Sequence, residues 1–263
     1  MNPSQTRHKH TQRTRVFLHT LAFALIGAGS SAALAQDKVC TPRNPIMASV
    51  KSVSDGRTFM LADGREVRLP ALEAPTPAAQ TTLSAFILGR EIALSPLVPA
   101  TDRYGRLNMR AFIAEQSVEA LLAAQGLAFA APRDDDDACM AALLKAERAA
   151  RAQKRGLWSE AARNTMRAQN SSALMASQGQ FGVVEGKVVS VRESGGTVYV
   201  NFGRRWSEDF TVTILKRNAR KFIDAGLEPK KLEGRSVRVR GWIEERGGPW
   251  IEAALPEQIE IAD

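Results

Sequence analysis

Apolar and polar residues alternate along short stretches of the first half of the chain, as they do in strands with one buried face. Asp55-Gly56 joins the first two stretches and Asp63-Gly64 leads into the third, which is typical of tight turns between antiparallel strands. The pattern predicts strands over residues 47–53, 58–61, 66–69, 91–94 and 107–114. Helical spacing predicts helices over 78–88, 117–125 and 139–154. We therefore expect a small five-stranded barrel with helices in this block.

The second half of the chain repeats the strand pattern. Gly195-Gly196 and Gly247-Gly248 provide hairpin turns, and a helical segment over 217–225 separates the third strand from the fourth. The predicted strands cover 183–191, 197–202, 210–214, 236–244 and 249–253. Strands in this number with one helix at this place predict a second small OB-like β-barrel. The fold class expected for the chain is therefore mainly β with helices (α+β), with two OB-type barrels in tandem.

The first residues have the composition of a secretory signal peptide. A basic stretch over 7–15 is followed by an apolar run over 16–28 and by small residues up to Ala35. The alternative, an uncleaved anchor helix, needs about 20 apolar residues, and His19 interrupts this shorter run. We expect cleavage after Ala35, export to the periplasm or the exterior, and no stable membrane insertion afterwards. The expected organisation is a signal peptide over 1–35, a first domain over 36–160, a linker over 161–180 and a second domain over 181–263.

The overall charge first suggests an anionic partner, because 36 Lys and Arg residues outnumber 28 Asp and Glu residues and give a formal charge of +8. The predicted signal peptide carries four of the basic residues, so its removal lowers the charge to +4. It also carries all three histidines. The mature protein would therefore lack Ser-His-Asp and Cys-His catalysis and zinc sites built from histidine. Its chemistry would depend on carboxylates, Arg, Lys, Tyr or a metal held by oxygen ligands.

Cys40 and Cys139 are the two cysteines of the chain, and both lie in the predicted mature protein. In an oxidising compartment an isolated pair favours a disulfide, with two unpaired thiols as the alternative. A bond between these positions would close a long loop and stabilise the fold by about 4 kcal/mol in the chain-entropy model.

Five short motifs occur in the first block. They are Asp55-Gly-Arg-Thr58, Val67-Arg-Leu-Pro-Ala-Leu-Glu-Ala-Pro75, Asp102-Arg-Tyr-Gly-Arg106, Val118-Glu-Ala-Leu-Leu-Ala-Ala-Gln-Gly-Leu127 and Lys154-Arg-Gly-Leu-Trp158. In their order and spacing, the motifs make this block resemble the thermonuclease (staphylococcal nuclease-like) family along nearly its whole length. The resemblance implies an OB-type barrel with helices for residues 36–160.

The resemblance also implies a chemistry. Members of this family cleave the phosphodiester bonds of DNA and RNA with one Ca²⁺ ion, which two carboxylates and a backbone carbonyl hold. A Glu acts near the attacking water, and two arginines clamp the phosphate. This division of roles is physically reasonable, since Ca²⁺ prefers hard oxygen ligands and bidentate guanidinium groups stabilise charge that develops on phosphate oxygens.

The arginine half of this site is present in the sequence. By resemblance, Arg68 and Arg106 are the catalytic, phosphate-clamping arginines, and Asp102 and Tyr104 fit the substrate-binding turn before Arg106. Glu73 stands at the second metal-ligand position, where the family has Asp, and is also a candidate catalytic carboxylate. Its longer side chain still offers the oxygen ligands that a hard cation prefers.

The carboxylate half of the site is degraded. Arg57 stands where the resemblance places the first metal carboxylate, and Thr76 stands where it places the catalytic Glu. A guanidinium about 4 Å from a divalent ion opposes its binding by several kcal/mol at an effective dielectric of about 20. Arg57 could instead join Arg68 and Arg106 in a three-arginine pocket that binds a substrate anion, or be an ordinary surface arginine. The resemblance therefore implies Ca²⁺ as the cofactor, while these two positions argue against its binding.

Structural alternatives exist for several other residues. Glu73 could form an ion pair with Arg68 that has no catalytic function. Asp134–Asp137 favours a solvated helix start over a metal cluster. The aromatic residues of the second block could stack on bases or belong to its core: Tyr199, Phe202, Trp206, Trp242 and Trp250.

Three functions remain open. The first is an exported thermonuclease-like protein that binds nucleic acid or another phosphorylated ligand, with weak or no phosphodiesterase activity. The second is an active metal-dependent endonuclease for DNA or RNA, whose metal site is rebuilt from Glu73, Asp55, Asp102 or other carboxylates. The third is a protein-interaction module of the cell envelope without phosphate chemistry. The family resemblance favours the second function, whereas Arg57 and Thr76 favour the first.

Overall fold

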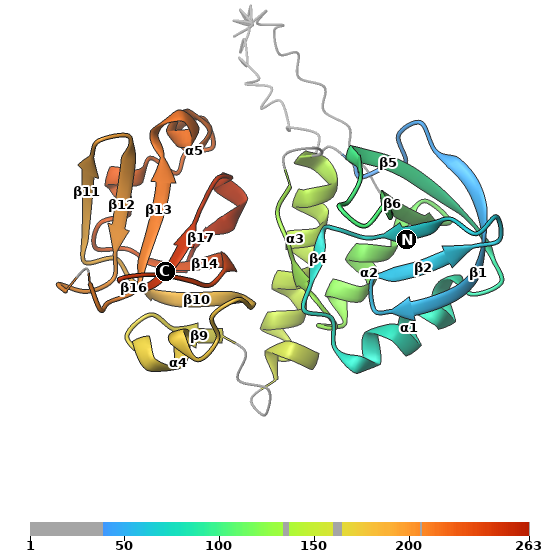
Figure 1. The fold of residues 1–263 in the computed structure, drawn as a ribbon, viewed down its shortest axis with the longest axis horizontal. Helices are drawn as coiled ribbons and strands as arrows, with labels where there is room; N and C mark the ends of the chain where they lie inside the picture. Colours follow the sequence, from blue (N-terminus) through green and yellow to red (C-terminus); the bar gives the residue numbers. More distant parts are fainter. Residues whose placement is uncertain (1–38, 134–136, 160–164, 206, 263) are drawn as a thin grey trace, which may run out of the picture. The chain divides into compact units, whose positions relative to one another are not determined.

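In a computed structural model, which describes residues 39–133, 137–159, 165–205 and 207–262, the first block forms a closed barrel (Figure 1). Its strands are β1 (Ile46–Asp55), β2 (Thr58–Leu61), β3 (Glu66–Arg68), β5 (Glu91–Thr101) and β6 (Leu107–Ile113). They pair in the order β3-β2-β1-β5-β6, and a parallel pairing between β3 and β6 closes the sheet. The predicted five-stranded barrel is therefore confirmed.

The barrel interior is filled by the apolar side chains that alternate along its strands. Val53 pairs with Phe59 across β1 and β2, and Phe59 pairs with Val67 across β2 and β3. Phe59 and Val67 are fully buried. Apolar residues of α1 and α2, such as Leu83 and Leu122, belong to the same core. The remaining elements of this block are β4 (Leu72–Glu73), α1 (Pro77–Ile87), β7 (Gln116–Ser117), α2 (Val118–Ala124), β8 (Phe129–Ala130) and α3 (Asp137–Ala152).

The second block has two sheets around one core (Figure 1). The first has the order β17-β14-β10-β9 and the second the order β11-β12-β13-β16-β15. The chain passes almost directly from β10 into β11 and from β14 into β15, so these strands connect the two sheets. The described strand pairs form two sheets and not one closed barrel, so the second barrel stays a prediction. The bounds are β10 (Phe181–Lys187), β11 (Ser190–Ser194), β12 (Thr197–Asn201), β13 (Thr211–Leu215), α5 (Ala219–Asp224), β14 (Ser236–Trp242), β15 (Glu244–Arg246), β16 (Gly248–Glu252) and β17 (Ile259–Ile261).

Part of the expected linker is folded. β9 (Thr165–Arg167) pairs parallel with β10, and α4 (Ser171–Met175) buries Leu174 in the core of the second block. The Asn170 side chain caps α4 by accepting a hydrogen bond from the N–H of Ala173. α4 has five residues and buries one apolar side chain, Leu174. One apolar position does not produce a helical pattern that could be recognised in the sequence. The proposed domain boundaries themselves stay a prediction.

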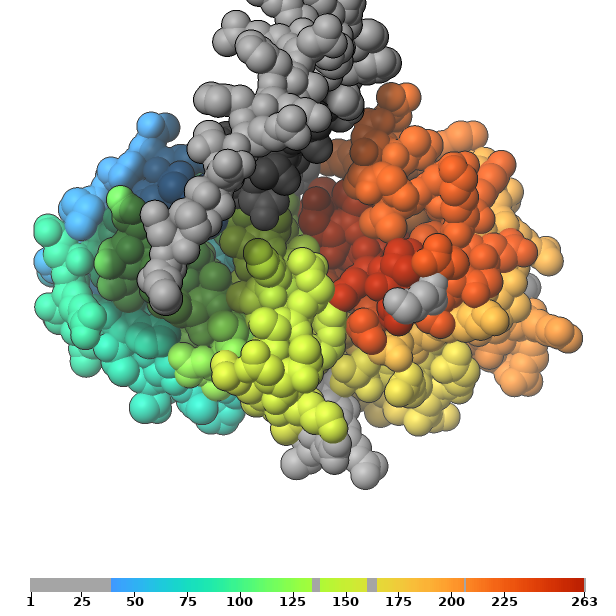
Figure 2. Space-filling model, turned by 180° about the vertical axis from the view of Figure 1, so that it is seen from behind, coloured from blue at the N-terminus to red at the C-terminus, as the bar shows by residue number. Residues whose placement is uncertain are grey.

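A disulfide fixes the start of α3. Cys139 is bonded to Cys40, so the predicted pairing is confirmed. One side of α3 buries Met140 and Leu143 in the barrel core. Another side faces solvent and is yellow-green in Figure 2. The helix is therefore a structural part of the first block and is tied covalently to the chain just before β1.

A third side of α3 carries a buried carboxylate. Glu147 is fully buried, and its Oε1 lies 2.7 Å from Nη1 of Arg240 in β14, whose side chain is 2% exposed. Its Oε2 accepts a hydrogen bond of 2.7 Å from the N–H of Ala130 in β8. At the edge of this contact, Nη2 of Arg151 lies 2.5 Å from Oε1 of Glu260 in β17. Buried charges therefore join α3 to the first sheet of the second block.

Residues 37–263 form one compact unit. Within the described part of this unit, no helix has the length and apolar character needed to cross a membrane. The predicted signal peptide lies outside the described residues.

The buried ion pair predicts a large loss of stability when one partner is removed. Arg240→Met should lower the free energy of unfolding by about 3–5 kcal/mol, because Glu147 would remain buried without its hydrogen-bonded cation and with Arg151 only at 3.6 Å. Urea denaturation measures this loss. Arg220→Met is the control, since Arg220 is 82% exposed in its ion pair with Asp224 and should contribute less than about 1 kcal/mol. Equal losses in both variants would contradict the role assigned to Arg240.

The disulfide predicts a second, redox-dependent contribution to stability. Cys40→Ala with Cys139→Ala should lower the free energy of unfolding by about 2–4 kcal/mol under non-reducing conditions. Denaturation of the unmodified protein in dithiothreitol should give a similar loss, whereas the variant should not respond to the reductant. A variant as stable as the oxidised protein would show that the bond contributes nothing.

Candidate functional site

The turn between β1 and β2 brings Asp55 and Arg57 to one end of the barrel. Oδ1 of Asp55 accepts the backbone N–H of Arg57 at 2.7 Å. Gly56 between them lies against the start of α1, where an added Cβ would stand 2.7 Å from the Cβ of Pro75 and 2.5 Å from the Cβ of Ala79. Glycine at this position therefore permits the close approach of the turn to α1.

Arg57 forms an ion pair with Glu73 of β4. Its Nη1 lies 2.5 Å from Oε1 of Glu73, and only 13% and 15% of the two side chains are exposed. The same nitrogen donates to the carbonyl oxygen of Leu72. Glu73 is opposite Phe129 in the pairing of β4 with β8, which fixes its position. Arg57 is therefore not an ordinary surface arginine, and Glu73 pairs with it rather than with Arg68, as the structural alternative had assumed.

Arg68, at the end of β3, lies beside the same turn. Its Nη1 donates to Oγ1 of Thr58 at 3.1 Å and lies 3.9 Å from Oδ2 of Asp55. Burial lowers the pKa of Arg68, and the positive charges of Arg57 and Arg106 lower it further, against two nearby carboxylates. Arginine keeps its proton in proteins, so Arg68 remains charged. The lowered pKa indicates that several positive charges lie close together here.

The turn between β5 and β6 holds Arg106 against Asp102. Nε and Nη2 of Arg106 both lie 2.7 Å from Oδ2 of Asp102, while Oδ1 accepts the backbone N–H of Tyr104 at 2.8 Å. Desolvation raises the pKa of Asp102, but these hydrogen bonds outweigh it, and the pKa is lowered overall. Asp102 therefore stays ionised near neutral pH and orients Arg106. The Tyr104 ring is 67% exposed, with the guanidinium carbon of Arg106 5.2 Å from its centroid.

These side chains meet in one cavity of about 600 Å³. Of the residues predicted from the sequence, it is lined by Arg57, Arg68, Glu73, Asp102, Tyr104 and Arg106. Trp242, one of the aromatic residues considered for base stacking, also lines the cavity. The lining residues that were not predicted are Pro70, Pro99, Arg103, Asn108 and Arg133. Arg103 could have been found, because it lies within the Asp102–Arg106 motif. Trp242 belongs to the second block, and no local signal connects it to this cavity.

The residues present do not fit a Ca²⁺ ion. The candidate ligand Glu73 is held by Arg57, whose guanidinium takes the space and the charge that a cation would need. Oδ1 of Asp55 accepts a backbone N–H, and the residue does not line the cavity. Within the described ranges, no group of three His, Cys, Asp or Glu side chains is arranged to hold a metal.

Thr76 stands where the resemblance implies a catalytic Glu. It precedes α1 as the N-cap residue, but its side chain makes no capping hydrogen bond. Its Oγ1 is buried without a hydrogen-bond partner in the described structure, and the residue does not line the cavity. An alcohol in this position cannot accept a proton from water near neutral pH.

The aromatic candidates of the second block differ in their exposure to solvent. Phe202 is 4% exposed in the core of the second block, and Trp250 is 4% exposed with its Nε1–H bonded to Oγ1 of Thr213 at 2.8 Å. Trp242 is 49% exposed and Tyr199 is 36% exposed, so these two can contact a ligand. Trp206 and residues 134–136 of the acidic run lie outside the described residues.

Part of the chain matches a known protein family. Residues 70–160 match the family described as Staphylococcal nuclease homologue. No curated protein matches the chain. The matched segment contains Glu73, Asp102, Tyr104 and Arg106, whereas Arg57 and Arg68 lie just before it.

The ion pair between Arg57 and Glu73 predicts how a metal site could be restored. Arg57→Asp with Thr76→Glu should raise the affinity for Ca²⁺ by at least about tenfold, because an oxygen ligand replaces a repelling charge at position 57 and a second negative charge is added nearby. Isothermal titration with CaCl₂ measures the change. Arg90→Asp, at an exposed position that does not line the cavity, controls for the change of charge made at position 57 and should leave the affinity unchanged. Equal affinities in the double variant and the unmodified protein would contradict the assignment of these positions.

Proposed function

Because the chain contains a staphylococcal nuclease-like domain, we propose that this protein binds nucleic acid through a phosphate-binding arginine site and has weak or no phosphodiesterase activity. The proposal depends on one observation above all. The guanidinium of Arg57, at the position where the resemblance implies a metal carboxylate, forms an ion pair with Glu73. The cavity that contains this pair also contains Arg68 and Arg106.

The arginines support binding of a phosphodiester. Among the described residues, Arg68 donates a single side-chain hydrogen bond, to Thr58, so its remaining N–H groups are available to a phosphate oxygen. Asp102 holds Arg106 by Nε and Nη2 and leaves Nη1 without a described partner. Charge-assisted hydrogen bonds from guanidinium groups to phosphate are short and strong.

The same cavity does not support efficient hydrolysis. Attack on phosphorus requires a base that accepts a proton from water, and such a base works best with a pKa near the operating pH. Glu73 is bound to Arg57, and the lowered pKa of Asp102 makes that carboxylate a weaker base. A phosphate on Arg68 and Arg106 would therefore be bound and oriented without an activated nucleophile.

The disulfide supports the proposed location. Bonds of this kind persist in oxidising compartments and are rare in the cytosol. The pairing of Cys40 with Cys139 is therefore consistent with the export predicted from the first residues of the chain. We propose a periplasmic or secreted protein.

A cleavage and binding assay tests the proposed function. The purified protein is incubated with plasmid and with single-stranded DNA in Ca²⁺, Mg²⁺, Mn²⁺ or EDTA, and we expect no metal-dependent cleavage. Binding of a fluorescent oligonucleotide, measured by anisotropy, should weaken with salt because phosphate contacts release counterions. Arg68→Ala should weaken it about tenfold or more, since a hydrogen bond to a charged group is lost.

Two controls separate the alternatives. Arg90→Ala removes an equal charge outside the cavity and should leave the affinity nearly unchanged. Metal-dependent cleavage that disappears in Arg68→Ala would show an active nuclease and overturn the proposal. If the protein binds no nucleic acid, the remaining alternative is a protein-interaction module without phosphate chemistry.

A further inference from the structure

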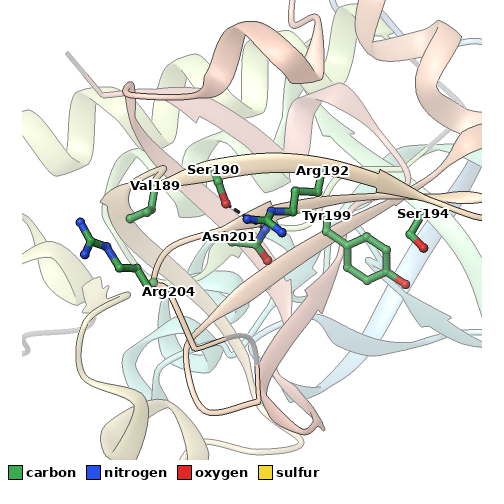
Figure 3. A pocket seen from close by; sticks show the side chains of 8 residues that line it. Val189, Ser190, Arg192, Ser194, Tyr199, Asn201 and Arg204 are labelled. Carbon is green, nitrogen blue, oxygen red and sulfur yellow. Dashed lines mark hydrogen bonds between the residues drawn. The ribbon is translucent and has the colours of Figure 1, made fainter.

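A second cavity, of about 840 Å³, lies on β11 and β12 of the second block (Figure 3). It shares no lining residue with the arginine cavity described above. Along its length, Figure 3 shows Arg204 at one end, Arg192 and Asn201 near the middle, then Tyr199 and Ser194 at the other end. This surface is called the strand face below.

Strand alternation explains why these side chains point outward together. Val198 and Val200 of β12 are buried in the core, so Tyr199 and Asn201 project from the opposite side of the strand. Arg192 of β11 is directly opposite Tyr199 in the antiparallel register. Cross-strand neighbours on one face lie about 5 Å apart at Cβ, so the guanidinium and the phenol ring border the same space.

The charge of the strand face is uncompensated. Arg192 and Arg204 are exposed, and neither has an ion pair or a side-chain hydrogen bond among the described residues. The residues that line the cavity include no carboxylate. The neighbouring acid, Glu193, alternates to the other side of β11, where its Oε1 lies 3.6 Å from Nζ of Lys230. Asp209 lies against Gly203, but its Oδ2 accepts the backbone N–H of Arg205 at 2.7 Å. Among the lining residues themselves, a ligand with negative charge would meet two guanidinium groups and no carboxylate.

The remaining lining residues favour a ligand with rings and polar edges. The Tyr199 ring is 36% exposed and offers an aromatic surface. Asn201 donates from Nδ2 to Oγ of Ser190 at 3.3 Å, which fixes an amide beside the guanidinium of Arg192. Stacking of bases on aromatic rings with arginines along the backbone is the general mode of single-strand recognition.

We propose that the strand face is a second binding site, for single-stranded nucleic acid. The phosphates contact Arg192 and Arg204, and one base stacks on Tyr199. An acidic peptide could satisfy the arginines but would gain little from Tyr199, and a duplex hides the faces of its bases. The observations therefore favour a single strand.

The test uses the full chain with Arg68→Ala, so that the arginine cavity contributes little. A 5′-fluorescein oligo(dT) of about 10 nucleotides is titrated and followed by anisotropy. Arg192→Ala with Arg204→Ala, and separately Tyr199→Leu, should each weaken binding about tenfold. Tyr199→Phe keeps the stacking surface and should retain the affinity. Arg90→Ala with Arg220→Ala matches the loss of charge at exposed positions away from this cavity and should change little.

A second measurement locates the contact directly. Irradiation of the complex with a 5-iodouracil oligonucleotide, followed by mass spectrometry, should give a crosslink at Tyr199. A crosslink confined to Tyr104 or Trp242, or equal affinities in Tyr199→Leu and Tyr199→Phe, would overturn the second site. Equal binding of an acidic peptide would overturn the choice of nucleic acid.

The two proposals fail separately in this design. If affinity depends on Arg68 but not on Arg192 and Arg204, the strand face is not a site and the proposed function stands. If affinity depends on Arg192 and Arg204 but not on Arg68, the strand face alone binds the strand and the phosphate site is wrong. Urea denaturation of each variant checks that exposed substitutions leave the fold intact.

Discussion

The fold depends on how it compensates one fully buried carboxylate, Glu147 of α3. An ionised carboxylate without partners would cost several kcal/mol in the interior, so its surroundings are constrained. One oxygen accepts the N–H of Ala130, and the other pairs with Arg240, which also donates to the carbonyl oxygen of Ala130. The backbone N–H and the carbonyl oxygen of Ala130 in β8 are therefore both hydrogen-bonded to this pair. Because β8 pairs with β4, this buried pair also fixes the strand that carries Glu73.

The position of Glu73 decides what the arginine cavity can do. A carboxylate fixed 2.5 Å from the guanidinium of Arg57 is already engaged and is not free to bind a cation. The same pairing removes the cost of burying the Arg57 guanidinium beside Arg68. A carboxylate at position 57 would favour a divalent cation, whereas the positive charge of Arg57 favours an anion such as phosphate. The three arginines can remain close together because carboxylates stand beside them and an anion can bind between them.

Local signals in the sequence predicted the parts of this structure that depend on neighbouring residues. Asp-Gly turns and strand alternation gave the barrel, and the isolated cysteine pair gave the disulfide. The contacts of Glu147 with Arg240 and of Trp242 with the arginine cavity join distant parts of the chain, and no pattern of spacing marks them. The partner of Glu73 was missed for a related reason. Arg57 and Arg68 both lie near β4, and only the turn geometry at Gly56 decides which of them reaches it.

The compensation of charge also distinguishes the two arginine surfaces. Arg57 is paired with Glu73, and Arg106 is paired with Asp102. A phosphate in their cavity would therefore meet guanidinium groups that are already oriented and partly neutralised. Such a site favours geometry over long-range attraction, because fixed donors lose little entropy on binding. Arg192 and Arg204 have no carboxylate, so they attract anions over a longer distance but hold them less rigidly. The positions of the carboxylates, rather than their number, determine which arginines can act on a ligand. A modest net charge is therefore compatible with nucleic-acid binding.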